Sequence, residues 1–252
     1  RLGLQGLLAS DPERQWQADG RTYDIPWAGA TLRVTMRAES GKIDLNRAPQ
    51  PLLVGLFGEV LPEADAESLA AAVIDWRDRD DRRSVDGAEA SDYRAAGRWG
   101  PANGPFERVS ELALVMGFDA GSVALLAPHL TVYSGGPRID PFSADRVVLA
   151  AVPGIGRETA DRFLAEREAL ALTGERPDLG LLAGGSRYLD TRTASPAVGI
   201  RAAARLDDGA SAAIEATVDL RPDDRPYAYL DWRPLFGDPL GLAVAGDGEA
   251  RP

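Results

Sequence analysis

The sequence predicts an α+β protein in which a helical block interrupts a β framework. Strand-like alternation stands near both ends of the chain, in residues 21–45 and again from Ser186 onward. Between them, residues 48–182 follow a helical pattern broken by proline and glycine. We therefore expect one sheet that is completed across an insertion. The expected divisions are 1–45 (the end of an N-terminal helix and the first strands), 46–185 (the helical domain) and 186–252 (returning strands and a tail).

The strands are predicted from a period of two. In residues 31–37, threonine and arginine alternate with leucine, valine and methionine, as in a half-buried strand. Asp207-Asp208-Gly209 is typical of a hairpin turn. The later strands are expected at RYLDTRT (187–193), VGIRAAARL (198–206), SAAIEATVDL (211–220) and YAYLDWRP (227–234).

The helical block contains an amphipathic helix that leads into an acidic loop. Leu69, Val73 and Trp76 form the apolar side of a helix predicted over residues 66–76. Seven carboxylates stand within 18 residues, and they repel one another unless solvent, arginine or a cation compensates. Gly87 is expected to let the loop fold back. The acidic residues are Asp75, Asp78, Asp80, Asp81, Asp86, Glu89 and Asp92, and the arginines among them are Arg77, Arg79, Arg82 and Arg83.

The residue pattern alone leaves two interpretations of this loop open. It is either a solvated surface neutralised by its arginines or a site for a hard cation such as calcium. It does not fit an EF-hand, because, counting from Asp78, arginine occupies the fifth position and no glycine stands at the sixth.

A weak internal repeat is present in the helical block. Residues 41–58 align with residues 137–154 at a constant offset of 96, with five identities. Each copy is expected to contain an extended segment, a short helix closed by glycine, and a second helix.

The second copy contains PGIG (residues 153–156), which resembles a helix-hairpin-helix turn. In nucleic-acid-binding proteins the glycines of this turn let backbone N–H groups approach a phosphate. The net charge of −11 and the pI of about 4.7 disfavour nucleic acid, as do Glu158 and Asp161 beside the turn. We expect no nucleic-acid partner, and we retain a helix-hairpin-helix nucleic-acid-binding protein as the alternative function.

The composition disfavours catalysis. There is no cysteine, and His129, for which we expect a structural role, is the only histidine, so no Ser–His–acid set is evident. No phosphate-binding GxxxxGK[ST] loop is present. A calcium-dependent hydrolase remains a third, less favoured possibility.

No run of 18 apolar residues is present. The chain opens at Arg1 on RLGLQGLLAS, which reads as the last turns of a helix, left either by trimming or by removal of a membrane anchor.

Several blocks in a fixed order resemble one family. They are GKIDLNRAP, AVIDWRDRDD, GAEASDYR, NGPFERVSELALVMGFD and LAPHLTVY, followed by the proline-glycine hairpin. Together they are similar to the K-type minor pseudopilin of the bacterial type II secretion system. The most distinctive block is NGPFERVSEL, followed by LAPHLTVY.

The resemblance implies a pilin-like antiparallel sheet packed on an N-terminal helix, with a large inserted α-helical domain containing helix-hairpin-helix-like (SAM-like) repeats. It implies a non-enzymatic subunit at the pseudopilus tip, assembled with I-type and J-type minor pseudopilins. It also implies an inner-membrane anchor through an N-terminal helix absent from this chain, and a body in the periplasm.

The resemblance further implies that the helical domain binds calcium. The best ligand candidates are Asp78, at the end of the predicted helix, and Asp86, Glu89 and Asp92, which surround Gly87.

Overall fold

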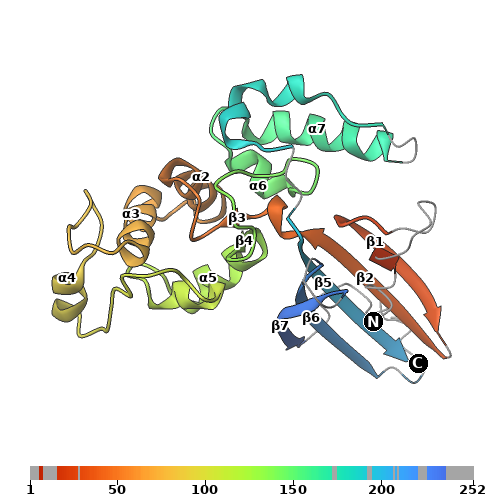
Figure 1. Cartoon of the computed structure of the whole chain (residues 1–252), viewed down its shortest axis with the longest axis horizontal. Coiled ribbons are helices and arrows are strands. Elements are labelled where there is room, and N and C mark those ends of the chain that lie inside the picture. Colours follow the sequence, from red (N-terminus) through yellow and green to blue (C-terminus); the bar gives the residue numbers. More distant parts are fainter. Residues whose placement is uncertain are drawn as a thin grey trace, which may run out of the picture. The chain divides into compact units, whose positions relative to one another are not determined.

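The computed structural model describes residues 6–7, 16–27, 29–171, 175–191, 195–206, 208, 210–220 and 226–236. The chain divides into two compact units (Figure 1). The sheet unit combines Arg1–Ala38 with Pro196–Pro252, and the helical unit is Glu39–Ser195. The units divide after Ala38 and after Ser195, whereas the sequence-based boundaries lie after residues 45 and 185.

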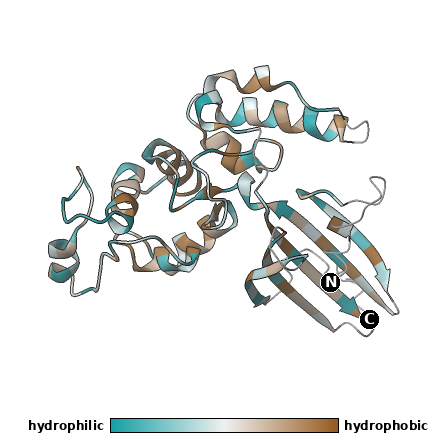
Figure 2. Ribbon diagram, viewed as in Figure 1, coloured by the Kyte–Doolittle hydropathy of each residue, from teal (hydrophilic) through white to brown (hydrophobic). Residues whose placement is uncertain are grey.

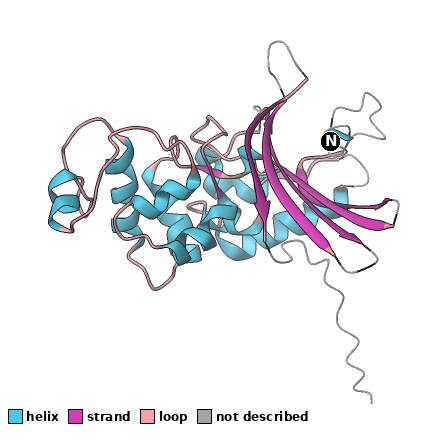
Figure 3. Ribbon diagram, turned by 90° about the horizontal axis from the view of Figure 1, so that it is seen from below, coloured by secondary structure: helices cyan, strands magenta, loops and turns pink. Residues whose placement is uncertain are grey.

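The sheet unit contains an antiparallel sheet of five strands in its described part (Figure 3). The strands are β1 (Asp19–Trp27), β2 (Ala30–Ala38), β5 (Ala197–Leu206), β6 (Ser211–Asp219) and β7 (Ala228–Leu235), in the order β1-β2-β5-β6-β7. Strands β2 and β5 pair from Ala30↔Leu206 to Ala38↔Val198. The strands that precede and follow the helical unit therefore share one sheet.

The two faces of the sheet differ in chemistry, because successive side chains of a strand point to opposite faces (Figure 2). One face is apolar, and the other carries ion pairs across the strands. On β6, Glu215 accepts hydrogen bonds from Arg201 Nε (2.7 Å) and Arg233 Nε (2.9 Å). Burial opposes ionisation of this carboxyl, but the two arginines lower the pKa of Glu215. The apolar cluster comprises Leu7, Val34, Met36, Val198, Ile200 and Val218.

One of the predicted strand segments is wrong. Within 187–193, Tyr188 ends a 3₁₀ helix, and Leu189 forms only an isolated parallel bridge with Ile139. The alternation there has another cause: Tyr188 is buried in the helical core, and the N–H of Leu189 bonds back to the carbonyl of Ser186. The strands predicted within residues 21–45 are confirmed as β1 and β2, of which β2 ends at Ala38. The predicted turn at 207–209 falls largely outside the described residues.

The helical unit consists of short helices and two very short strands. They are η1 (Glu39–Gly41), β3 (Ile43–Asp44), α2 (Gln50–Val60), α3 (Ala66–Arg77), α4 (Ala90–Ala95), η2 (Val109–Leu114), α5 (Ala120–Leu126), η3 (Ala127–His129), β4 (Leu130–Thr131), α6 (Arg146–Ala151), α7 (Gly156–Leu170) and η4 (Leu179–Tyr188). The helix predicted at 66–76 is confirmed as α3.

The core of the helical unit is continuous. The rings of Phe57 and Phe118 pack edge to face at 5.3 Å, and Trp76 lies 5.8 Å from Tyr93 (centroid distances). Full burial of one such side chain contributes about 1.5–3 kcal/mol. Across the described ranges, no helix combines the length and apolarity needed to cross a bilayer.

The two segments aligned in sequence make matching contacts. Ile43 pairs with Leu130, and Ile139 pairs with Leu189, in both cases in parallel. The next residue of each copy is an aspartate that accepts a hydrogen bond from the backbone two residues on. The distances are 2.8 Å from Asn46 N to Asp44 Oδ1 and 3.0 Å from Phe142 N to Asp140 Oδ1. Helices α2–α3 and α6–α7 come next in the two copies.

Candidate functional site

The acidic loop joins α3 to α4 and folds back on the end of α3. The α3 helix begins where the side chain of Asp65 accepts from Ser68 N (3.2 Å), and Asp75 lies in its last turn with 0% exposure. Both carboxylate oxygens of Asp75 accept from the N–H of Ser84 at 3.2 Å. This contact holds the loop against the helix.

Glycine is required at position 87 by close approach rather than by an unusual backbone conformation. A Cβ there would lie 2.1 Å from Asp75 Oδ2. The left-handed conformation is taken by the preceding residue, Asp86, at φ 60°. The prediction that Gly87 lets the loop fold back is therefore right in effect, but its reason is different.

Three buried side-chain oxygens around this loop have no hydrogen-bond partner in the described structure. They belong to Asp78 (Oδ1), Glu89 (Oε1) and Asn103 (Oδ1). Glu89 is only 3% exposed. A buried, unpartnered carboxylate oxygen is costly, so native proteins rarely leave one without an ion, water or donor beside it.

The pKa values of two carboxyls indicate that like charges converge here. Burial raises the pKa of Asp78, and the charges of Asp80 and Asp75 raise it further. Burial also raises the pKa of Glu89, with added repulsion from Asp75, Asp78 and Asp81. A nearby cation would reverse both effects.

The other two predicted ligands are engaged differently. Asp92 caps α4: its Oδ2 accepts from Glu89 N at 2.9 Å, and Arg83 Nη1 lies 3.3 Å from its Oδ1. The backbone hydrogen bond from Glu89, more than the charge of Arg83, lowers the pKa of Asp92. Asp86 is exposed. Among the described residues, Asp78 and Glu89 each keep one buried oxygen without a partner, while Glu89 and Asp92 together form the capping box of α4.

Few of the four arginines neutralise the loop. Arg77 donates to the backbone carbonyls of Leu45 and Ala48 instead of to a loop carboxylate, and Arg83 pairs with Asp92. Arg79 and Arg82 are exposed, and neither forms an ion pair within the described ranges. The loop therefore keeps an excess of unpaired negative charge.

Asn103 was not singled out by the sequence analysis. Its Nδ2 donates to Asp81 Oδ1 at 3.0 Å, while its own Oδ1 stays without a partner. It adopts φ 48° in the NG of PANGPF, a conformation that asparagine tolerates better than most residues. That dipeptide was the available signal.

The described residues contain no group of three aspartate, glutamate, histidine or cysteine side chains close enough to hold a metal ion by themselves. In that same part of the chain, the buried oxygens without a partner around this loop come instead from two carboxylates and one amide. Calcium accepts such mixtures, because it is bound by six to eight oxygens from carboxylates, amides, backbone carbonyls and water. These oxygens are of the kind that calcium binds. Three of them are too few for a full calcium shell, so further oxygens from the chain or from water would be needed.

The PGIG turn packs on the protein through Ile155, which is buried, and through the backbone of Gly154, while Gly156 is exposed. A Cβ on Gly154 (φ +90°) would lie 2.4 Å from the carbonyl oxygen of Gly184 in η4, so the two backbones are in contact. The basic residues nearby are paired: Arg157 Nε lies 2.8 Å from Glu59, and Arg146 Nε lies 2.5 Å from Asp161. This geometry is that of a packing turn.

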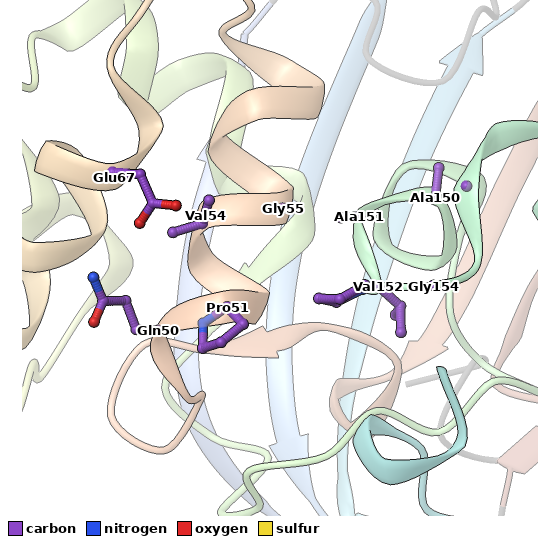
Figure 4. A pocket seen from close by; sticks show the side chains of 11 residues that line it. Gln50, Pro51, Val54, Gly55, Glu67, Ala150, Ala151, Val152 and Gly154 are labelled. Atoms are coloured by element: carbon purple, nitrogen blue, oxygen red, sulfur yellow. The ribbon is translucent and has the colours of Figure 1, made fainter. Parts of the chain in front are cut away.

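A groove of about 630 Å³ lies between α2 and this turn (Figure 4). Pro51 and Val54 on α2 and Val152 before the turn supply apolar walls, and Gly55 lets α2 approach α6. Glu67 is the sole ionisable side chain among the described residues that line it. A single carboxylate offers no acid–base pair.

A solved structure shares this fold. One chain of the GspK-GspI-GspJ complex from the enterotoxigenic Escherichia coli type 2 secretion system matches with a TM-score of 0.62 and 19% identity. The match covers 94% of the present chain and 92% of that chain. At this identity the likeness establishes the fold. A comparison with curated proteins found no match.

Residues 40–135 match the family described as type II secretion system (T2SS), protein K. The matched range begins at Ser40 and contains the acidic loop, Asn103 and β4. This match supports the resemblance to protein K of the type II secretion system that the sequence blocks indicate.

Proposed function

We propose that this protein is a structural minor pseudopilin at the tip of the type II secretion pseudopilus. It assembles there with I-type and J-type minor pseudopilins, and the tip initiates and caps the pseudopilus for protein export. Its body lies in the periplasm, held to the inner membrane by an N-terminal helix. The observation that carries the proposal is the fold shared, over 94% of the chain, with a chain from a complex named for GspK, GspI and GspJ.

The role is assembly rather than catalysis. The groove described above has one ionisable side chain, and the remaining acidic cluster has no histidine or cysteine beside it in the described ranges. An assembly subunit needs surfaces and a rigid body, both of which the sheet and the continuous helical core supply.

Assembly is tested by co-purification with I-type and J-type pseudopilins. The chain is expected to co-purify with both in calcium. Replacing Leu4 and Leu8 by glutamate is expected to weaken association, because we expect the apolar N-terminal segment to pack beside helices of the partners. Both residues lie outside the described residues. Leu125→Glu, on the exposed side of α5, is the matched control and leaves association unchanged. Failure to associate with either partner would contradict the proposal.

We also propose that the acidic loop binds calcium. Asp78, Glu89 and Asn103 supply the oxygens that lack partners, and Asp75 and Asp81 lie beside them. Asp86 is exposed beside Gly87, and Asp92 accepts a hydrogen bond from Glu89 N. When bound, the ion supplies positive charge that offsets the carboxylate repulsion and ties the loop to the end of α3.

Calcium binding is tested by melting temperature and calorimetry on metal-free protein. Binding to the native state alone stabilises it by about 2.7 kcal/mol when calcium is about 100 times its dissociation constant, so melting should rise by several degrees. Magnesium should substitute poorly, because it is smaller and holds its water tightly.

Glu89→Gln should remove most of this calcium effect, and Asp86→Asn is the matched control that should retain it. Identical melting in calcium and chelator, with no heat of binding, would leave the loop as a solvated acidic surface.

A further inference from the structure

In each copy of the repeat an arginine in the last turn of the second helix binds the turn before the first helix, although the two arginines do not align at the offset of 96. Arg77 is the last residue of α3, and its guanidinium donates to the carbonyls of Leu45 and Ala48, the latter at 2.7 Å. Arg167 lies in the last turn of α7, and its Nη1 donates to the carbonyls of Pro141 (3.0 Å), Phe142 (3.0 Å) and Ala144 (2.8 Å).

The carbonyls that these arginines bind are equivalent. With the offset of 96, Leu45 corresponds to Pro141 and Ala48 corresponds to Ala144. Both sets lie in the turn that leads from the parallel bridge into the first helix of a copy. Each arginine therefore ties the end of the second helix to the start of the first, and a planar guanidinium suits such a bridge because its donors are fixed in one fork.

We call each of these arginine bridges a clamp. The two clamps differ in the chain segments beside them. Asp78 comes directly after Arg77 and terminates α3, with its N–H bonded to the carbonyl of Ile74 at 3.0 Å. Asp75 lies two residues before Arg77 and anchors Ser84 of the acidic loop. After Arg167, α7 continues to Leu170 and leads to no acidic loop of this kind.

We infer that Arg77 is a positioning residue of the calcium site, which it serves by clamping the end of α3 so that Asp75 and Asp78 are held in place. This inference rests on the proposed calcium binding. Arg77 need not touch the ion, since residues behind the ligands commonly set metal affinity by fixing ligand orientation.

The charge of Arg77 works in the opposite direction. A guanidinium close to Asp78 repels a bound cation, so removal of the charge alone would strengthen calcium binding. Loss of the clamp would weaken calcium binding, because the ligands at the end of α3 would have to be ordered by the ion itself. The sign of the change in affinity therefore separates positioning from charge.

The test compares Arg77→Gln, Arg77→Lys and Arg167→Gln by calcium calorimetry, with melting in chelator and circular dichroism to verify folding. Both Arg77 variants should weaken calcium binding by about 10- to 100-fold, the range typical of residues that orient metal ligands. Lysine keeps the positive charge but not the planar fork of donors, so Arg77→Lys should not restore wild-type calcium affinity. Arg167→Gln should lower the melting temperature in chelator while leaving calcium affinity within about twofold, because its clamp has no acidic loop.

Unchanged or tighter calcium binding by Arg77→Gln would overturn the inference while leaving calcium binding itself intact. Equal weakening by Arg167→Gln would also overturn it, because the effect would then be general loosening of the unit. A wild-type protein that gives no heat with calcium would overturn the calcium proposal and this inference together.

Discussion

The two copies of the repeat share their framework and differ in the segment that comes after the second helix. In the second copy the chain passes from α7 through η4 to the bridge at Leu189. In the first copy the acidic loop, α4, η2 and α5 come before the corresponding bridge at Leu130. The packing scaffold is thus used twice, and the candidate site lies only in the segment added to one copy, as expected when loops on a rigid scaffold carry function.

The copies also differ at the glycine that was expected to close the first helix: Gly58 lies inside α2, which runs on to Val60, whereas Gly154 follows the end of α6. Gly58 and Gly154 align. A Cβ on Gly58 would meet only Ala66 Cβ at 3.9 Å, which is ordinary contact, whereas a Cβ on Gly154 would press on a backbone oxygen at 2.4 Å. One position is spacious and the other is closed by η4.

The largest expected effect on the free energy of unfolding comes from this difference in space at the two aligned glycines. Gly154→Ala should lower the free energy of unfolding by roughly 1–3 kcal/mol, because backbone must shift to admit the methyl group. Gly58→Ala should raise it by about 0.5–1 kcal/mol, because alanine is preferred inside a helix. Denaturant unfolding measures both variants. Equal effects would mean that the two copies are packed alike at this turn.

A smaller effect is expected from the buried carboxyl of Glu89 in the first copy, whose Oε2 accepts from Ala90 N and whose Oε1 has no partner in the described structure. The pKa of Glu89 is raised, so the folded protein binds more protons than the unfolded chain above about pH 4.5, the usual value for this group. In chelator, wild type should therefore lose stability relative to Glu89→Gln as pH rises from that value toward 7. Melting temperature against pH measures the difference.

The second copy provides a control in which the dependence of stability on pH has the opposite sign. The hydrogen bond from Arg146 lowers the pKa of Asp161, so Asp161 contributes stability above pH 3.8 that is lost as pH falls. Asp161→Asn should remove that contribution. Parallel pH profiles for wild type and Glu89→Gln would show that the first copy holds no such strained carboxyl.

The last prediction is that DNA binding is absent. The PGIG turn of the second copy should bind neither duplex nor single-stranded DNA at physiological salt, because Gly154 packs on η4 and the chain carries a net charge of −11. A mobility-shift titration tests this. A micromolar complex that weakens steeply with added salt would favour the nucleic-acid alternative over packing for this turn.

The sequence by itself determined the elements whose cause is local. Alternation in residues 31–37 became β2, and the spacing of Leu69, Val73 and Trp76 became α3, because these periods arise from backbone geometry within a few residues. It also located the acidic loop and the blocks that resemble the type II secretion system protein K, whose family model matches residues 40–135. The same local logic failed at 187–193, where alternation arose from a 3₁₀ turn against a core contributed by distant residues.

Only the tertiary structure decided which groups of the acidic loop are available to a ligand. Charge counting could not tell that Asp92 is consumed as a helix cap, that Arg77 turns to the carbonyls of Leu45 and Ala48, or that Asn103 reaches Asp81. These facts depend on residues that are distant in sequence but meet in space. A carboxylate oxygen can bind an ion only with lone pairs that no hydrogen-bond donor or arginine already occupies. The packing of the chain decides which donors lie beside it.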